Sequence, residues 1–241
     1  AENIVNRPPE LSCACHIDDS VYKVKSPMIG IYNVSNCLAA LATCVKGLGI
    51  PPERAVAALA TQKTVPGRME RIDLGQNFTA IVDFAHTPNA LAVSLETART
   101  LTQGKVIAVF GSAGLRDREK RKMMPVESIR RADMSILTAE DPRTESLDAI
   151  LQDMADAAVA AGGVEGQNFL RVADRGDAIR KAIALAQPGD LVISLGKGHE
   201  QSMCFITTEY DWDDRTAMRA ALAEHLGVEG PKMPWLPTSE S

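Results

Sequence analysis

The feature that most limits the possible folds is a regular alternation of short apolar runs and amphipathic helices, which starts near Met69. The apolar runs are short, continuous and partly β-branched, which is typical of strands buried on both faces of a sheet. They are Thr79–Phe84, Val106–Phe110, Met134–Leu137, Phe169–Val172 and Leu191–Leu195. Strands that alternate with helices predict an α/β fold: a Rossmann-like, mainly parallel sheet with helices on both faces.

The helices between these runs have recognisable starts. Thr87-Pro88 combines an N-cap residue with proline at the first helical position. Another apolar stripe begins at Leu147, Asp174 is placed to cap the next helix, and a last helix is expected from about residue 213 to residue 226.

The first part of the chain is less regular. Residues 1–32 carry short alternating runs that we expect to be edge strands or loops and not a complete fold. From Asn33 the spacing of apolar residues predicts a helix that ends near Gly47, and Pro51-Pro52 opens a second helix through Ala60. We therefore expect residues 1–66 to complete a domain that lies outside this chain.

Four of the predicted strands are followed at once by polar residues, mostly with glycine or proline among them. Any one such cluster could be an ordinary turn. The carboxyl ends of parallel strands, however, share one edge of a sheet, where ligands bind. Four clusters at that edge favour a single site, and they are Asp83–Pro88, Gly111–Asp117, Glu140–Arg143 and Gly196–Glu200.

The residue types in these clusters suit a ligand with both charges. Arg116 and Arg143 can each fork two hydrogen bonds onto a carboxylate or phosphate. Glu140, Asp141 and Glu200 are suited to accept from an ammonium group, as in an amino acid. Asp83 follows its strand where acids accept ribose hydroxyls in nucleotide-binding sheets. The sequence thus predicts one ligand that resembles an amino acid and one that resembles a nucleotide.

Composition restricts the setting. A net charge of −5 argues against a nucleic-acid partner, which would need a basic surface. Five cysteines, an odd number spread along the chain, favour a reducing cytoplasm over a disulfide framework. No apolar run reaches the length that crosses a bilayer, so no membrane partner is expected. Cys13-Ala14-Cys15-His16 has no second ligand pair at suitable spacing, so no metal site is predicted.

Five motifs occur in order along the chain: VPGRMERID (65–73), VDFAHTPNAL (82–91), FGSAGLRDREKR (110–121), TAEDPRTE (138–145) and GKGHE (196–200). Together they resemble the Mur ligases of the MurE type, the UDP-N-acetylmuramoyl-tripeptide synthetases. A sixth segment, Ile29–Leu41, resembles the helix that lies near the end of the central ATPase domain in that family. The resemblance extends from about residue 29 to residue 227.

The resemblance implies a division of the chain into parts. Residues 1–66 would be the end of the central ATP-binding domain, residues 67–230 the Rossmann-like C-terminal domain, and residues 231–241 a flexible tail. The N-terminal and central domains of the same polypeptide would then be partners that this chain lacks.

The family's reaction implies the substrates. ATP, with Mg²⁺ whose ligands lie outside this chain, activates a carboxylate as an acyl phosphate, and the amine of an incoming amino acid attacks it. Here the acceptor would be UDP-N-acetylmuramoyl-L-alanyl-D-glutamate in peptidoglycan synthesis. The incoming diamino acid would be meso-diaminopimelate, with lysine or ornithine as alternatives.

The resemblance also implies roles, residue by residue, and no catalytic residue among them. The nucleotide-binding set would be Asn33 and Asn36 on the adenine side, Arg68 at the phosphates, Asp83 at the ribose and His86 beside the nucleotide. The set that holds the incoming amino acid would be Arg116, Asp141, Arg143, Gly196 and Glu200.

Two positions depart from the family pattern. The usual Asp-Asn-Pro-Arg reads Glu140-Asp141-Pro142-Arg143, and Leu115 stands where aspartate is usual. Arg143 favours a substrate with a distal carboxylate, whereas the extra charge of Asp141 could favour a plain diamine.

A P-loop is the main missing element. No GxxxxGK[ST] segment occurs in the 241 residues, so we expect the chain by itself to have no ligase activity. Two alternatives stay open. One is a sister ligase such as folylpolyglutamate synthase or a cyanophycin-synthetase-like enzyme, and the other is a non-catalytic module that binds an amino acid or a nucleotide.

Overall fold

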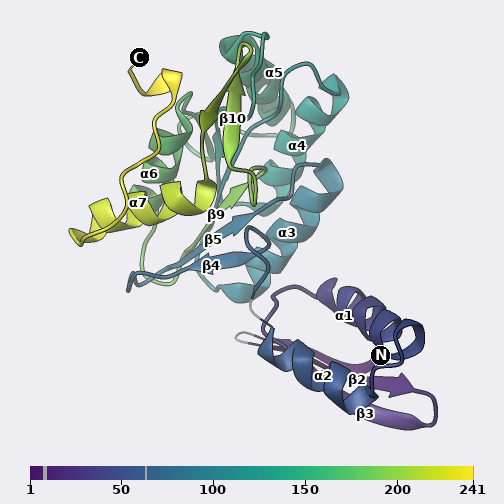
Figure 1. Cartoon of the computed structure of the whole chain (residues 1–241). Coiled ribbons are helices and arrows are strands. Elements are labelled where there is room, and N and C mark those ends of the chain that lie inside the picture. Colours follow the sequence, from purple (N-terminus) through teal and green to yellow (C-terminus); the bar gives the residue numbers. More distant parts are fainter. Residues whose placement is uncertain (8–9, 63, 241) are drawn as a thin grey trace. The chain divides into compact units, whose positions relative to one another are not determined.

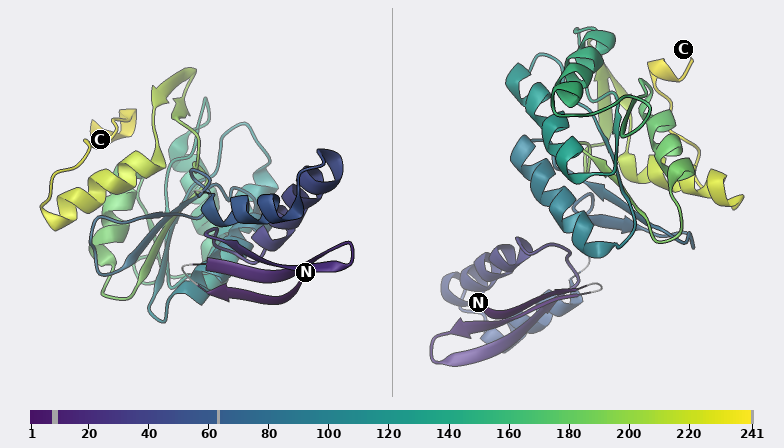
Figure 2. Two further views of the ribbon diagram at one scale, coloured as in Figure 1. Left: turned by 60° about the horizontal axis from the view of Figure 1, so that its bottom comes forward. Right: turned by 180° about the vertical axis from the view of Figure 1, so that it is seen from behind.

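The computed structural model describes residues 1–7, 10–62 and 64–240. They form two compact units, Ala1–Val65 and Pro66–Ser241, which are drawn in Figures 1 and 2.

Unit 1 is a three-stranded antiparallel sheet with two helices. Its elements are β1 (Glu2–Arg7), β2 (Glu10–Ile17), β3 (Ser20–Ser26), α1 (Asn33–Ala42), a π-helical turn (Thr43–Gly47) and α2 (Pro52–Thr61). Leu11 on β2, Val24 on β3, Leu41 on α1 and Leu59 on α2 share one buried core. The expectation of edge strands or loops underestimated this region, because β2 pairs with both β1 and β3 and the unit has a buried core of its own.

Side chains alternate across β2. Cys13 and Cys15 point into the core, whereas His16 is exposed. Neighbouring residues of a strand face opposite sides, so the two thiols and the imidazole cannot meet at one point. The two cysteines serve as small core residues.

Unit 2 is built on a six-stranded sheet in the order β4-β5-β9-β6-β7-β8. The strands are β4 (Glu70–Ile72), β5 (Thr79–Asp83), β6 (Val106–Phe110), β7 (Met134–Leu137), β8 (Phe169–Arg171) and β9 (Leu191–Leu195). All neighbours pair in parallel except β4, which is antiparallel to β5. The predicted fold class is confirmed, and the five predicted strands lie within a residue of their expected bounds.

Helices cover both faces of this sheet (Figures 1 and 2). One face carries α3 (Pro88–Leu101), α4 (Arg118–Arg131) and α5 (Leu147–Ala160), and the other carries α6 (Arg175–Leu185) and α7 (Asp214–Leu226). The strands are buried on both sides because alternate residues serve the two layers. Val82 packs in the layer that holds Ile179 and Met218, while its neighbour Ile81 is equally buried toward the opposite layer. None of the helices in the described part of the chain combines the length and apolar character that crossing a membrane requires.

The helix starts confirm the capping prediction. The side chains of Thr87 and Asp174 accept hydrogen bonds from backbone N–H groups in the first turns of α3 and α6. Asp213 does the same for α7. Helix α4 was not predicted, because its sequence is mostly charged and contains Pro125.

Two further elements depart from the sequence prediction. A hairpin of β10 (Ser202–Phe205) and β11 (Thr208–Asp211) follows the GKGHE motif and was not predicted, because β11, with the sequence TEYD, is largely exposed and has no apolar run. The segment expected to be a flexible tail is packed against unit 2. Leu236 is fully buried, and Ser239 Oγ donates to Asp174 Oδ2 at 2.9 Å.

Candidate active site

The loops that follow four parallel strands meet at one edge of the sheet, as the sequence predicts. We name them the β5 loop (84–87), the β6 loop (111–117), the β7 loop (138–146) and the β9 loop (196–201). Gly196 N donates to Asp83 O at 3.1 Å, which joins the β9 loop to the end of β5. Gly114 N donates to Asp141 O at 2.9 Å, which joins the β6 loop to the β7 loop.

Glycines allow these loops to touch. A Cβ on Gly198 would lie 2.5 Å from Gly67 O and 2.7 Å from Phe84 Cβ, and a Cβ on Gly196 would collide with Glu140 Oε2. Gly196 also has φ +108°, which favours glycine. The sequence led us to expect that the glycines of GKGHE leave room for a ligand. In the structure the room beside Gly196 and Gly198 is filled by protein atoms.

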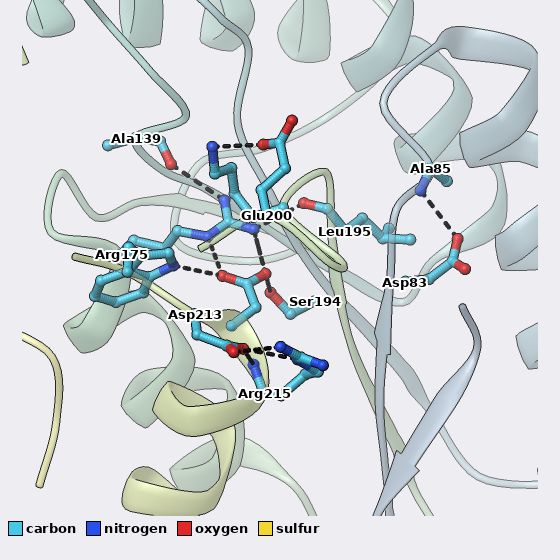
Figure 3. A network of polar contacts seen from close by, with 12 residues as sticks. Asp83, Ala85, Ala139, Arg175, Ser194, Leu195, Glu200, Asp213 and Arg215 are labelled. Atoms are coloured by element: carbon cyan, nitrogen blue, oxygen red, sulfur yellow. Dashed lines mark hydrogen bonds and ion pairs between the residues drawn. The ribbon is translucent and has the colours of Figure 1, made fainter. Parts of the chain in front are cut away.

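Lys197 joins two of the motifs. It is buried, and its Nζ lies 3.0 Å from Asp141 Oδ2. The same Nζ lies 2.5 Å from Oε2 of Glu200, whose side chain is labelled in Figure 3. Cys204 N also donates to Asp141 Oδ1 at 2.8 Å. The carboxylate of Asp141 is therefore balanced by a buried cation, while the side chain of Glu200 keeps 39% exposure on the solvent side of the pair. Lys197 was absent from the predicted site, because only the fold brings it to a residue 56 positions earlier.

Glu140 is a buried acid without a full set of partners. It is 6% exposed, and its Oε2 accepts no hydrogen bond from the described residues. Burial raises the pKa of Glu140 to about 7, although the charges of Arg175, Lys120 and Lys197 oppose that rise. The acid therefore changes its protonation state near neutral pH.

Arg143 supplies the matching unpaired donor. Its Nε is buried and has no hydrogen-bond acceptor among the described residues. The backbone at Arg143 has φ +54° and that at Asp141 has φ +41°, in the left-handed region that non-glycine residues rarely adopt. Cys204 holds this backbone through its O, which accepts from Arg143 N at 3.1 Å. Strain held in place by tethers is typical of binding and catalytic loops.

Arg116 lies outside this contact network. Its side chain is exposed and has no hydrogen bond or ion pair to a described residue. Its neighbour Leu115 is fixed, because Leu115 N donates to Glu145 Oε1 at 2.5 Å. This bond, together with Arg121, holds the pKa of Glu145 below its usual range. The structure thus anchors the β6 loop and leaves the predicted Arg116 free in solvent.

Three basic side chains surround the ring of Phe84. Arg68 Cζ lies 4.3 Å from the ring centroid, and the rings of His86 and His199 lie at 4.4 Å and 4.5 Å. Arg68 and His86 belong to the predicted nucleotide set, so the structure brings these two together. His199 was not predicted, since nothing in its sequence position distinguishes it from a surface histidine.

Asp83 is occupied by the fold. It is 5% exposed and accepts from Ala85 N at 3.0 Å (Figure 3), from Met69 N at 2.9 Å and from Ser94 Oγ at 2.8 Å. These bonds fix the turn that carries the β5 loop. Oδ2 accepts one of the three bonds and keeps the capacity for a second.

Asn33 and Asn36 belong to unit 1. Asn33 Nδ2 donates to Ile29 O at 2.7 Å, and Asn33 Oδ1 accepts from Asn36 Nδ2 at 2.8 Å. Both lie in the first turn of α1, where the pair helps to hold the preceding chain.

Comparison with known proteins gives the family. Residues 67–198 match the family described as Mur ligase, glutamate ligase domain. A UDP-N-acetylmuramyl-tripeptide synthetase of Roseiflexus sp. (strain RS-1) is 49% identical over 203 residues, which are 84% of this chain and 40% of that protein. A UDP-N-acetylmuramoyl-L-alanyl-D-glutamate--2,6-diaminopimelate ligase of Geobacillus thermodenitrificans (strain NG80-2) is 40% identical over 224 residues, 93% of this chain and 45% of that protein.

Solved structures agree. One of a UDP-N-acetylmuramoyl-L-alanyl-D-glutamate--2,6-diaminopimelate ligase has a TM-score of 0.64 at 31% identity and covers 93% of this chain and 45% of that one. A Mycobacterium tuberculosis folylpolyglutamate synthase has a TM-score of 0.65 at 16% identity over 95% of this chain and 48% of that one, which shows a shared fold alone. The chain spans less than half the length of these relatives. Because the family match covers more than half of the chain itself, the chain belongs to the Mur ligase family.

Proposed function

We propose that the chain is the C-terminal part of an ATP-dependent amino-acid ligase of the MurE type. The whole protein would add a diamino acid to UDP-N-acetylmuramoyl-L-alanyl-D-glutamate in peptidoglycan synthesis, in the cytoplasm. The relatives named tripeptide synthetase and diaminopimelate ligase, at 49% and 40% identity, support this choice over a folylpolyglutamate synthase at 16%.

One observation carries the proposal: a single motif leaves both an acceptor and a donor unpaired. Glu140 Oε2 and Arg143 Nε are buried without partners among the described residues, three positions apart. Burial of unpaired polar atoms is costly, so their presence points to a ligand that satisfies them. A zwitterion offers an ammonium group for the acid and a carboxylate for the guanidinium. Each charge-assisted hydrogen bond would contribute roughly 1.5–3 kcal/mol.

The surroundings of Asp141 support meso-diaminopimelate over lysine or ornithine. In the sequence analysis, the extra negative charge of Asp141 was the reason to consider a plain diamine as the substrate. Lys197 Nζ lies 3.0 and 3.1 Å from the two oxygens of Asp141, so this charge is balanced within the protein. Arg143 Nε then remains as the group that selects a distal carboxylate.

The amino-acid set keeps its other proposed members. Glu200, half-buried beside Lys197, would accept from the substrate's distal ammonium group. Gly196 would act indirectly, by letting Glu140 approach the β9 loop. Arg116 would swing from solvent onto the ligand.

The residues around Phe84 fit a nucleotide. Arg68 is exposed and is supported on the Phe84 ring, so its guanidinium can bind phosphate oxygens. His86 lies beside it, and Asp83 Oδ2 can accept one ribose hydroxyl. Asn33 and Asn36 would serve the adenine side of the nucleotide. ATP bound with Mg²⁺ supplies the phosphoryl group that activates the acceptor carboxylate.

We further propose that the 241 residues by themselves do not form the amide bond, because they hold no GxxxxGK[ST] segment for the phosphates. A hybrid enzyme tests the function. The matching C-terminal segment of the Roseiflexus relative would be replaced by this chain, and ATP-dependent amide formation measured with the UDP-linked dipeptide. We expect turnover with meso-diaminopimelate, at least about tenfold less with lysine and none with the isolated chain.

The alternatives predict other results. Turnover with glutamate on a folate acceptor would indicate a sister ligase. A hybrid that folds and binds the amino acid but never turns over would indicate a non-catalytic module. Turnover by the isolated chain would contradict the proposal about the P-loop.

A further inference from the structure

Arg175 is a buried arginine that the proposed substrate sites do not use. It is the first residue of α6 and is fully buried. Its guanidinium donates to two backbone carbonyls, Leu195 O at 2.8 Å and Ala139 O at 3.1 Å (Figure 3). Leu195 is the last residue before the β9 loop, and Ala139 immediately precedes Glu140.

Leu195 ends β9 and Ala139 lies two residues after the end of β7, and these two strands are not neighbours. In the sheet β6 lies between β9 and β7, so ladder hydrogen bonds cannot join the two directly. Arg175 spans this interval from one face of the sheet. The two carbonyls that it binds lie two residues before Asp141 and two residues before Lys197, which form an ion pair.

A network keeps the guanidinium charged and fixed. Arg175 Nε and Nη2 each donate to Asp214 at 2.7 Å. Asp214 also accepts from Ser194 Oγ and from Trp212 Nε1, both at 2.7 Å. Burial alone would raise the pKa of Asp214, but the charge and hydrogen bonds of Arg175, with those of Ser194 and Trp212, hold it below its usual range.

Such a network is a poor device for stability alone. Apolar residues of similar volume often stabilise a core as well as a buried ion pair does. What apolar residues cannot supply is a planar fork that donates to an acid and to two carbonyls at fixed angles.

We propose that Arg175 is a positioning residue that sets the spacing between the β7 loop and the β9 loop. Through this spacing it places Glu140 and Arg143 opposite Lys197 and Glu200. The part of the proposal that concerns amino-acid binding rests on the proposed function. The part that concerns the spacing of the two loops does not depend on it.

Two variants of the 241-residue chain test it. Arg175→Lys keeps the charge beside Asp214 but cannot reach both carbonyls. The double variant Arg175→Met/Asp214→Leu removes both buried charges together, so that no lone charge unfolds the protein. The control is Asp190→Asn. Asp190 is also buried, but it accepts from Lys105 N and Gln187 N at the opposite edge of the sheet.

Amide hydrogen exchange is the first readout. We expect the amides of Gly196 and Arg143, one in each loop, to exchange at least about tenfold faster in both Arg175 variants. The amide of Ala178, within α6, should keep its rate, as should all three amides in the control. If the loop amides keep their rates, or if all amides speed up together, Arg175 is merely structural and the proposal is overturned.

Calorimetric titration with meso-diaminopimelate is the second readout. In the folded Arg175 variants the affinity should fall about tenfold, whereas Asp190→Asn should lower only the melting temperature. Unchanged affinity in the Arg175 variants would contradict the role in binding. If the unaltered chain binds no amino acid, the proposed function fails, while hydrogen exchange still decides the positioning role.

Discussion

The two edges of the sheet in unit 2 share the same strands but satisfy their polar groups differently. At the amino edge, Asp190 is buried and accepts from two backbone N–H groups, at 2.7 and 2.8 Å. Asp133 accepts from Val106 N at 2.7 Å and pairs with Arg99. At the carboxyl edge, Glu140 and Arg143 each keep a buried polar atom that no described residue satisfies.

The two edges of the sheet also differ in backbone conformation, and the strained residues lie at the carboxyl edge. The non-glycine residues of unit 2 with positive φ all lie in the carboxyl-edge loops or in segments that contact them. They are Met69, Leu115, Asp141, Arg143 and Ile206. At the amino edge the positive angle is taken by Gly75 and Gly189. One edge is therefore built for stability, and the other carries strain and unpaired charge that a ligand would relieve.

Glycine substitution should give the largest contrast. Gly67 and Gly227 share φ +66°, but a Cβ on Gly67 would overlap the backbone of Gly198, whereas a Cβ on Gly227 meets nothing within 4 Å. Gly227→Ala should cost about 1 kcal/mol, and Gly67→Ala about 4 kcal/mol. Urea unfolding followed by tryptophan fluorescence measures this in unit 2, where both tryptophans lie. If the two variants lost the same free energy of unfolding, the contact between Gly67 and Gly198 would be looser than the structure shows.

Loss of the buried cation should rank next. Lys197→Met leaves Asp141 and Glu200 without their shared partner, and we expect a cost of about 3 kcal/mol. At the other edge, Arg99→Met breaks a pair whose two side chains are about 40% exposed, at a cost of about 0.5 kcal/mol. The same urea titration compares them. A small loss for Lys197→Met would show that the two acids are well solvated without it.

The pH dependence of stability should reveal Glu140. Its pKa is raised to about 7, so the folded chain holds the proton more tightly than the unfolded chain does. The contribution of Glu140 to the free energy of unfolding is fully present below pH 4.5, and it is lost as the pH rises through about 7. Glutamine cannot ionise, so Glu140→Gln escapes this loss. The difference in free energy of unfolding between Glu140→Gln and the unaltered protein should therefore shift by about 2 kcal/mol in favour of the variant from pH 5 to pH 8.

Glu224→Gln is the control for this titration. Arg180 lowers the pKa of Glu224, so its contribution is present at neutral pH and is lost as the pH falls, the opposite sign. A pH profile of Glu140→Gln parallel to that of the unaltered protein would show that Glu140 is ordinarily ionised in the folded state.

The smallest expected effect is on the selectivity between meso-diaminopimelate and lysine. Asp141→Asn removes one of the two carboxylates on Lys197, so the site becomes more positive and lysine should bind about fivefold more weakly, while meso-diaminopimelate keeps its affinity. Asp133→Asn, at the amino edge, should change neither affinity. Calorimetry with both amino acids measures the ratio. An unchanged ratio would mean that Asp141 does not act on the distal group of the substrate.

The strands and their common edge could be predicted because they depend on local patterns. Buried strands such as Val106–Phe110 are continuous apolar runs, and the parallel topology then places their ends together. Helix α4 could not be predicted in this way, because its charged face is satisfied by partners such as Glu145, which pairs with Arg121 24 positions away.

The position of the site could be predicted from the sequence, but the contacts between its side chains could not. The clusters at the strand ends indicated where a ligand would bind. That Lys197 would be buried between Asp141 and Glu200, and that glycines would admit Glu140 and Phe84 instead of a ligand, depends on contacts between loops far apart in the chain. Leu236 is a similar case, because the few apolar residues of its short proline-rich segment give no periodic signal.

The side-chain Nε–H signal of Arg143 tests the central claim most directly. In a titration of the ¹⁵N-labelled chain with meso-diaminopimelate, this signal, assigned through Arg143→Lys, should shift and saturate as the guanidinium gains a carboxylate. The Nε–H of Arg180, already bonded to Glu224 at 2.7 Å, should not move. An Arg143 signal that stays in place while the amino acid binds, or no binding at millimolar concentration, would contradict the assignment of an amino-acid site to this edge.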